Sequence, residues 1–251
     1  MMNKYEQGLV YNFEKLGCAG LAFKLSNVFS SGHVRDEDLL KVLTDTTEDE
    51  ILRIKQERAE RLLSQASLKN SYANLDMIEY DTERNLDKTL IDRLSTCEYI
   101  NEAANIIIVG AAGTGKTFLA KAFAIQACNE GFRTRVFHLR ALLRDLSERE
   151  KDDGESYVRR LKYLSNIPLL VIDEWFSIAP DKKELVILHE LIDARYSKHT
   201  TIICSQMTTD NWAKYCGNQA LGESITGRLK GHCYLINLKG DDLRKKHFQR
   251  P

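Results

Sequence analysis

The sequence is poor in proline, carries no net charge and contains no long hydrophobic run. These features bear on helix formation, on binding to polyanions and on membrane insertion. Only three prolines occur among 251 residues, which leaves long stretches free to form helices. The 36 basic and 36 acidic residues cancel, so bulk charge alone predicts no polyanionic partner. The longest apolar runs have the length of a strand, far below the roughly 20 residues that a membrane-spanning helix needs. We therefore expect no membrane insertion.

The six cysteines form neither a metal-binding nor a disulfide pattern. They are scattered, with no Cys-x-x-Cys pair and no histidines at the spacing of a zinc site. The first residues, Met-Met-Asn-Lys-Tyr-Glu-Gln, lack the apolar segment of a secretory signal. We therefore expect reduced, buried cysteines in a cytoplasmic protein.

The residues that are present have the composition of a globular protein with an uneven charge distribution. The 251 residues fit one large domain or an ordinary domain with a smaller one, and the 43% apolar and 29% charged residues fit a globular rather than a disordered protein. Residues 32–60 carry nine acidic and five basic side chains, whereas residues 225–251 carry seven basic and two acidic ones. Such an asymmetry can mark a local anion-binding surface.

The first part of the chain shows the hydrophobic spacing of helices. Residues 4–30 have a helical pattern interrupted by glycines, and a second pattern runs from residue 36 to about 68. Thr46 or Thr47 is a candidate N-cap before an acidic run. The basic side chains of the second pattern indicate a solvated face or, alternatively, a DNA-contacting one. The expected divisions are a helical N-terminal domain, a linker with a lead-in, and a core domain, at 1–68, 69–104 and 105–251.

From residue 105 onward, strand patterns alternate with helical patterns. The expected strands are 106–109, 134–139, 168–172, 200–205 and 233–238, and the clearest helices are 116–130 and 182–196. Such alternation predicts an α/β fold, with a parallel five-stranded sheet flanked by helices. The 28 residues between the second and third strands have room for two helices, where a plain crossover needs one.

A glycine-rich motif follows the first expected strand and opens the next helix. The motif fits G-x-x-x-x-G-K-[ST] and consists of Gly110, Ala111, Ala112, Gly113, Thr114, Gly115, Lys116 and Thr117. Its backbone N–H groups and the helix N-terminus can bind a phosphate, while Lys116 reaches the β- and γ-phosphates and Thr117 binds Mg²⁺. The alternative is a glycine-rich turn that only caps a helix. The strand–loop–helix context favours a nucleotide site.

An acidic pair supplies the second half of such a site. Asp173 ends an apolar strand, so its carboxylate should lie beside the phosphate-binding loop and hold Mg²⁺. Glu174 follows it and can accept a proton from attacking water, which favours hydrolysis. Gln206, with Ser205 before it, ends the fourth strand and can contact the γ-phosphate or orient the water, or it can simply cap the strand. Arg228 alone would be a solvated surface residue.

These segments together resemble the IstB-type transposition helper ATPases and the related DnaC-type helicase loaders. The resemblance runs through ordered segments, at Asn105–Ala120, Val171–Trp175, Arg195–Tyr196, Thr201–Gln206, Ile225–Leu229 and Leu238–Arg244. The helical leader from about residue 10 to 68 is similar to the N-terminal domain of the family. The resemblance therefore covers nearly the whole chain.

The resemblance implies a P-loop AAA+ module of the initiator clade that binds ATP and Mg²⁺. It implies that Asn105 and Phe118 belong to the ATP-binding segment, and that Arg228 acts in trans on the ATP of a neighbouring subunit. The sequence departs from the family at several positions. Alanines stand where two prolines are usual, Phe118 and Phe176 replace a histidine and a glycine, and Gln206 replaces an asparagine, at 111–112, 118, 176 and 206.

The resemblance implies an ATPase that forms an ATP-dependent oligomer on double-stranded DNA and passes the DNA to its transposase. Since no base-reading motif is visible, we expect binding to DNA phosphates without sequence preference. The candidate contacts are basic residues that could also be simply solvated, namely Arg140, Arg144, Arg149 and Lys151, or Lys245 and Lys246. The alternative is a DnaC-like helicase loader with the same chemistry. A small-molecule kinase would need an acceptor-binding lid, which is not evident.

Overall fold

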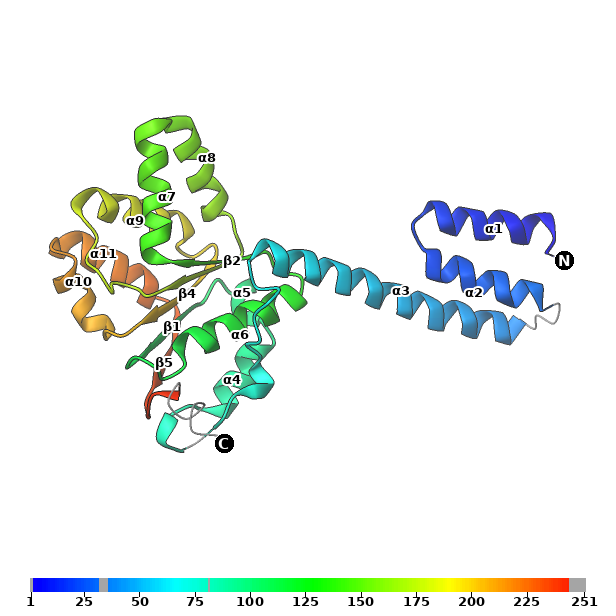
Figure 1. Ribbon diagram of the computed structural model, residues 1–251, viewed down its shortest axis with the longest axis horizontal. Helices are drawn as coiled ribbons and strands as arrows, with labels where there is room; N and C mark the ends of the chain where they lie inside the picture. Colours follow the sequence, from blue (N-terminus) through cyan, green and yellow to red (C-terminus); the bar gives the residue numbers. More distant parts are fainter. Residues whose placement is uncertain (1, 32–35, 81, 244–251) are drawn as a thin grey trace. The chain divides into compact units, whose positions relative to one another are not determined.

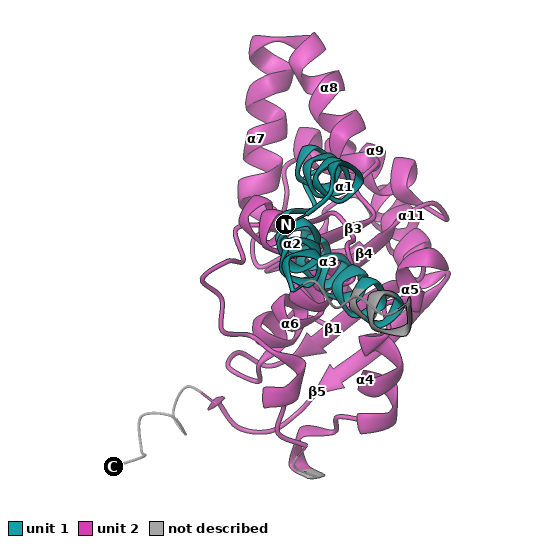
Figure 2. Ribbon diagram, turned by 90° about the vertical axis from the view of Figure 1, so that its right-hand side faces the viewer, with its two compact units in different colours: residues 1–59 teal, residues 60–251 magenta. Residues whose placement is uncertain are grey.

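The computed structural model describes residues 2–31, 36–80 and 82–243 (Figure 1). The candidate DNA contacts Lys245 and Lys246 lie outside the described residues. The chain divides into two compact units, Met1–Ala59 and Glu60–Pro251, which Figure 2 colours separately. Helix α3 (Asp36–Gln65) runs through this division. Within the described residues no helix is long and apolar enough to cross a membrane.

The first unit contains α1 (Lys4–Lys15), α2 (Ala19–Ser30) and the first part of α3. The expected N-cap at Thr46 or Thr47 is wrong, because α3 continues through both residues. The hydroxyl of Thr47 donates instead to the carbonyl oxygen of Leu43 at 2.8 Å. A threonine hydroxyl can donate a hydrogen bond to a carbonyl oxygen in the preceding turn of its own helix. A threonine followed by acidic residues is therefore compatible with a helix interior.

Arg53 shows that at least one basic side chain of α3 has a structural role. Its guanidinium donates to the carboxylate of Glu50 at 3.1 Å and to the carbonyl oxygen of Gly17 at 3.2 Å. Glu50 is itself buried, and the contact with Arg53 lowers the pKa of its carboxyl group. Arg53 therefore joins α3 to the turn after α1 within the first unit, instead of forming part of a solvated basic face.

The second unit is built on one parallel sheet, as the sequence predicts. Its strands are β1 (Asn105–Gly110), β2 (Thr134–His138), β3 (Leu169–Asp173), β4 (Thr200–Ser205) and β5 (Cys233–Leu238). They pair in the order β2-β3-β4-β1-β5, all parallel. Because all strands run the same way, the carboxyl ends of β1, β3 and β4 meet at one edge of the sheet. That edge collects the polar residues expected to form the site.

Helices cover both faces of this sheet (Figure 1). They are α4 (Lys88–Ser95), α5 (Glu98–Asn101), α6 (Lys116–Asn129), α7 (Leu139–Asp152), α8 (Gly154–Ser165), α9 (Lys182–Arg195), α10 (Trp212–Tyr215) and α11 (Gln219–Lys230). Alternate residues of β1 serve opposite faces: Ile106 and Ile108 pack with α4, α5 and α6, whereas Ile107 and Val109 pack with α7, α9 and α11. The interval between β2 and β3 holds two helices, α7 and α8, as its length predicts.

The structure divides the chain differently from the expected linker at 69–104. Helices α4 and α5 lie within that segment, and Ile91, Leu94 and Tyr99 are at most 2% exposed. Their side chains pack in the same core cluster as Phe123 of α6. The segment is thus part of the second unit, and its burial is a tertiary effect that its polar local sequence does not reveal.

Candidate functional site

The loop between β1 and α6 has the backbone shape that its glycines permit. Gly113 and Gly115 adopt left-handed conformations, with φ of +81° and +93°, which side chains strongly disfavour. Gly110 lies so close to β5 that a Cβ there would be 2.5 Å from the carbonyl oxygen of Leu238. Gly115 caps α6, so the positive end of the helix faces the loop. The loop is therefore shaped to bind a phosphate with its backbone.

Lys116, the first residue of α6, is buried at the loop. Its side chain is directed back toward the loop, where Nζ donates to the carbonyl oxygen of Ala111 at 2.7 Å. The hydroxyl of Thr114 donates to the same oxygen at 2.9 Å. The sulfur of Cys204 lies 3.6 Å from the carbonyl oxygen of Lys116, and burial raises the pKa of this thiol. The charge of Lys116 is thus fixed beside the glycine-rich backbone.

Thr117 and Asp173 come together as the sequence predicts. The Thr117 hydroxyl donates to Oδ2 of Asp173 at 2.7 Å, and Oδ1 of Asp173 accepts from the backbone N–H of Glu174 at 2.8 Å. Asp173 is only 5% exposed. A hydroxyl and a carboxylate are the hard oxygen ligands that Mg²⁺ prefers, and Mg²⁺ usually takes few protein ligands together with phosphate oxygens. These two residues fit a nucleotide-bound Mg²⁺ ion.

Glu174 stands on a strained turn immediately after β3. Its φ is +54°, and its side chain is 59% exposed, with Oε2 3.8 Å from Nδ1 of His138. The backbone after it is tied to β4, because Trp175 N–H donates to the carbonyl oxygen of Cys204 at 2.8 Å. The hydroxyl of Ser205 donates to the carbonyl oxygen of Trp175 at 3.1 Å. Ser205 therefore holds this turn in place.

One cavity of about 360 Å³ joins most of the predicted site residues. Its lining includes residues of the loop, both acidic residues and the end of β4, namely Ala112, Gly113, Lys116, Thr117, Asp173, Glu174 and Gln206. Gln206 is exposed to this space. The arrangement places a cation, a candidate metal site and an exposed carboxylate around one volume. It can bind a nucleotide's phosphates and present a base to a water molecule beside them.

Asn105 and Arg228 lie away from this cavity. Asn105 begins β1, whereas the loop starts at the other end of this strand, five residues later and about 16 Å away at the usual rise of a strand. Its amide nitrogen donates to the carbonyl oxygen of Leu229 at 3.2 Å, and its amide oxygen accepts from the N–H of Thr201 at 2.9 Å. Asn105 thus joins β1 to β4 and α11. Arg228 is next to Leu229 and belongs to the same distant edge.

Two residues that the sequence did not indicate contact the loop. Arg84 donates to the carbonyl oxygen of Thr114 at 3.3 Å and to that of Glu79 at 2.7 Å. A Cβ on Gly113 would clash with the carboxylate of Asp242. These contacts bridge 30 residues in one case and more than 100 in the other. Asp242 lies in the segment 238–244 that carries the family resemblance, but neither contact follows from a local sequence pattern. Phe118, by contrast, is half-buried and packs on the core cluster that contains Phe123.

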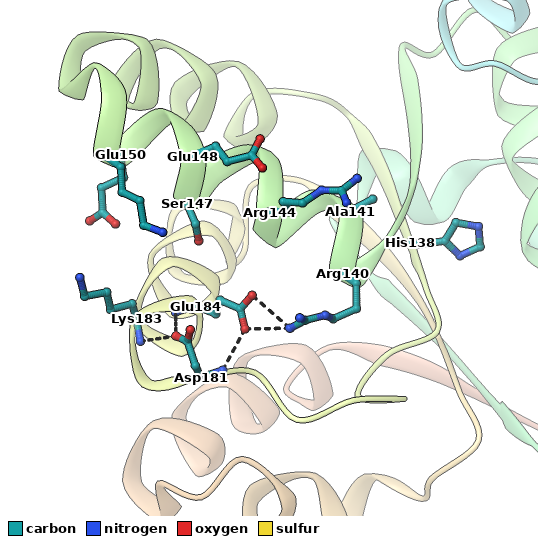
Figure 3. A pocket seen from close by; sticks show the side chains of 11 residues that line it. His138, Arg140, Ala141, Arg144, Ser147, Glu148, Glu150, Asp181, Lys183 and Glu184 are labelled. Atoms are coloured by element: carbon teal, nitrogen blue, oxygen red, sulfur yellow. Dashed lines mark hydrogen bonds and ion pairs between the residues drawn. The ribbon is translucent and has the colours of Figure 1, made fainter.

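The candidate DNA contacts fall on two different surfaces. Arg140, Arg144 and Lys151 line a second cavity of about 460 Å³ between α7 and the start of α9 (Figure 3). Arg140 forms an ion pair with Glu184 at 2.9 Å. Arg149 is not in this lining, because its guanidinium donates to Asp145 at 2.7 Å and to Ser156 at 2.8 Å. The expected four residues therefore do not form one basic surface.

Comparison with known proteins identifies the family. The family described as IstB-like ATP binding protein matches residues 12–250, nearly the whole chain. The chain belongs to this family. An ATP-binding protein of insertion sequence IS232 from Bacillus thuringiensis subsp. berliner is 25% identical over 252 residues, covering 100% of this chain and 99% of that protein. The insertion sequence ATP-binding protein y4pL of Sinorhizobium fredii is 29% identical over 173 residues, 69% of this chain and 70% of that protein.

Solved structures support the fold of this IstB-like protein. The crystal structure of the DnaC helicase loader has a TM-score of 0.56 at 21% identity and covers 67% of this chain and 98% of the other. AMPPCP-bound DnaA from Aquifex aeolicus also has a TM-score of 0.56, at 17% identity, covering 72% of this chain and 56% of the other. The expected P-loop AAA+ fold, with helices preceding a parallel five-stranded sheet, is therefore confirmed. The family match makes this an ATP-binding protein.

Proposed function

We propose that this protein is an ATPase that assembles on double-stranded DNA when it binds ATP and delivers that DNA to a transposase. The site geometry supports the chemistry, since a cation, two candidate metal-ligand residues and an exposed carboxylate surround one cavity. The insertion-sequence relatives support the transposition context. The sequence-independent contact with DNA is inferred from the lack of a base-reading element.

The polar groups of the cavity suit separate tasks in hydrolysis. The backbone of residues 113–117 and the ammonium of Lys116 bind the phosphates, while Thr117 and Asp173 hold Mg²⁺. Mg²⁺ held by these two residues would supply positive charge beside the phosphates. Glu174 accepts a proton from the water that attacks the γ-phosphate, which releases ADP and phosphate. Gln206 lies where it can hydrogen-bond that water or the γ-phosphate.

The position of Arg228 is the observation that favours a shared site. Arg228 lies near Asn105 at the start of β1, whereas its own phosphate-binding loop lies at the end, a position that supports action on the ATP of a neighbouring subunit. Such a head-to-tail contact builds a ring or a filament. An arginine supplied in trans stabilises the charge of the transition state and is worth roughly 10³–10⁵-fold in related nucleotide hydrolysis. ATP would therefore drive assembly, and hydrolysis would reverse it.

The cavity between α7 and α9 is the surface that we propose for DNA phosphates. Arg144 and Lys151 are exposed there, and Arg140 can exchange Glu184 for a phosphate oxygen (Figure 3). One monomer offers few cations, but an assembly repeats them from subunit to subunit. Binding through phosphates alone would leave sequence unread.

A helicase loader is the second candidate, because the structure of the DnaC helicase loader shares this fold over 98% of its length. Its nucleotide chemistry would be the same, and only the partner would differ. Stable binding to a replicative helicase, without binding to a transposase or to DNA, would favour this alternative.

The shared site is tested by mixing two inactive variants and measuring ATP hydrolysis. Glu174→Gln should bind ATP normally but lose about 10²–10⁴-fold in turnover. Lys116→Ala should instead weaken ATP binding, and Arg228→Ala should lose turnover. A mixture of Glu174→Gln and Arg228→Ala contains some sites in which both groups are intact. If sites act independently in a head-to-tail assembly, a 1:1 mixture should recover about a quarter of the wild-type rate. A mixture no faster than its components would contradict the proposal.

A further inference from the structure

Arg228 is held by a constellation of side chains from two helices. Asp193 and His189 lie one turn apart on α9, and Ser224 and Arg228 lie one turn apart on the adjacent α11. Nε and Nη2 of Arg228 donate to Oδ1 of Asp193 at 2.7 Å and 2.6 Å. Nη1 donates to the carbonyl oxygen of Ser224 at 3.2 Å and also to its hydroxyl. The guanidinium therefore donates to Asp193 through Nε and Nη2 and to Ser224 through Nη1.

His189 extends this constellation by one contact. Its Nε2 is 3.0 Å from the hydroxyl oxygen of Ser224, within hydrogen-bond distance. The Ser224 hydroxyl can accept from Arg228 and donate its own proton to a neutral His189. Each helix thus contributes two polar residues, and Asp193, Ser224 and, through Ser224, His189 orient the guanidinium of Arg228.

The guanidinium keeps donor capacity while it is held. Arginine has five N–H groups, and among the described residues only Asp193 and Ser224 accept from Arg228. One N–H of Nη2 remains for a further acceptor, and the Arg228 side chain is 29% exposed. Asp193 and Ser224 therefore limit the conformations of the Arg228 side chain while its charge stays partly exposed.

We propose that Asp193 is a positioning residue that, with Ser224 and His189, holds Arg228 for the γ-phosphate of a second copy of this chain. This rests on the proposed trans action of Arg228. Without Asp193, Ser224 and His189, the arginine side chain would lose its rotamer freedom only on meeting the neighbour's phosphate. That loss of entropy would raise the activation free energy of hydrolysis. With these three residues, the side chain is oriented before the neighbour arrives.

The energetics favour positioning over stabilisation of the fold. Asp193 is 53% exposed, and exposed ion pairs add little to folding stability. Catalysis is more sensitive, because a misplacement of about 1 Å can cost roughly 10²-fold in rate. The Ser224 contacts would survive the loss of Asp193. We therefore expect Asp193→Asn to lower ATP turnover about tenfold without loss of folding.

The test compares four single variants for ATP binding and for ATP hydrolysis at several protein concentrations. Asp193→Asn and Ser224→Ala should bind ATP like the wild type but turn it over more slowly, and Asp193→Ala should be slower than Asp193→Asn. The control is Asp210→Asn, which breaks the 3.2 Å ion pair of Asp210 with Lys230 on the same helix α11. Asp210→Asn should retain the wild-type rate.

Mixing distinguishes positioning in trans from a local structural role. Glu174→Gln subunits keep Arg228 and Asp193 intact, so adding them should raise the rate of Asp193→Asn about fivefold above the mean of the separate proteins. A slow Asp193→Asn that Glu174→Gln does not rescue would overturn the inference, as would an Asp193→Asn at the wild-type rate. If Arg228→Ala is rescued in parallel, only the inference fails. If it is not, the proposed shared site itself fails.

Discussion

At the scale of single residues, Phe176 resolves one departure from the family pattern. The family usually has glycine at this position, and Phe176 still adopts the glycine-like φ of +53°. Its ring is 2% exposed and packs on the rings of Trp175, Trp212 and Tyr215, with centroids 4.6, 6.2 and 6.5 Å away. Aromatic packing thus offsets the backbone strain, which is of order 1–2 kcal/mol for a side chain in this region.

Phe176→Gly should destabilise the protein even though it restores the usual residue. Loss of a buried phenylalanine costs roughly 3–5 kcal/mol, and relief of strain returns about 1–2 kcal/mol. We expect the free energy of unfolding in urea to fall by about 2–3 kcal/mol. The matched control is Phe176→Ala, which makes the same cavity but keeps a Cβ. It should be less stable than Phe176→Gly, and the reverse order would contradict the left-handed backbone.

At the scale of helices and strands, Arg195 joins the end of α9 to its surroundings. This side chain is 1% exposed and donates to the carbonyl oxygens of Leu164 and Ile167 at 2.7 and 2.8 Å, and to that of Thr200. Burial lowers the pKa of Arg195 to about 9, which leaves it protonated at neutral pH. One cation therefore satisfies carbonyl groups from α8, the loop before β3, and β4.

Arg195→Met should lower the free energy of unfolding by about 3 kcal/mol, because each buried carbonyl left without a donor costs roughly 1–3 kcal/mol while removal of a buried charge gives some back. Chemical denaturation measures this change. Arg195→Lys, which keeps a charge and fewer donors, should lie between Arg195→Met and the wild type. Wild-type stability in Arg195→Met would show that these hydrogen bonds add nothing.

The sequence predicts those elements whose signals are local. The strand at Ile106–Val109 is a continuous apolar run ended by glycine, and the loop after it follows from residue types at fixed spacing. The side-by-side placement of Thr117 and Asp173 follows from the parallel sheet.

The remaining features depend on contacts between distant segments. Tyr99 is buried only because α5 packs under the sheet, and the contact of Asp242 with Gly113 joins residues far apart in the chain. Asn105 belongs to the matched family segment, yet its amide is used by backbone partners at the far end of β1. Arg149 is a basic residue of the kind that contacts DNA phosphates, but its guanidinium donates to the carboxylate of Asp145. That pair is local, because the two residues lie four apart on α7, a spacing that the sequence shows, whereas the contact of Arg149 with Ser156 joins α7 to α8.

At the scale of the whole molecule, the absence of net charge constrains how DNA can be bound. A neutral monomer with few exposed cations in one cavity has little affinity for a polyanion. An assembly through the neighbouring ATP site would repeat Arg144 and Lys151 along the DNA. Affinity should then depend on nucleotide, because nucleotide controls how many subunits act together.

The salt dependence should identify the contacting side chains. Each phosphate that is neutralised contributes about −0.9 to the slope of log affinity against log salt concentration. The double change of Arg144 and Lys151 to alanine should flatten this slope without altering ATP binding. Arg149→Ala is the control, because Asp145 already holds that side chain. A slope reduced equally by both would show that the cavity between α7 and α9 is not the DNA surface.

The most direct test of the account is the affinity for two duplexes of unrelated sequence, measured at several salt concentrations with and without a non-hydrolysable ATP analogue. The account predicts negligible binding without the analogue. With it, binding should be tight, steeply salt-dependent and about equal for the two duplexes. Binding that ignores the analogue would contradict ATP-driven assembly, and strong preference for one duplex would contradict contact through phosphates. No binding to either duplex, together with binding to a replicative helicase, would replace the proposed function with that of a helicase loader.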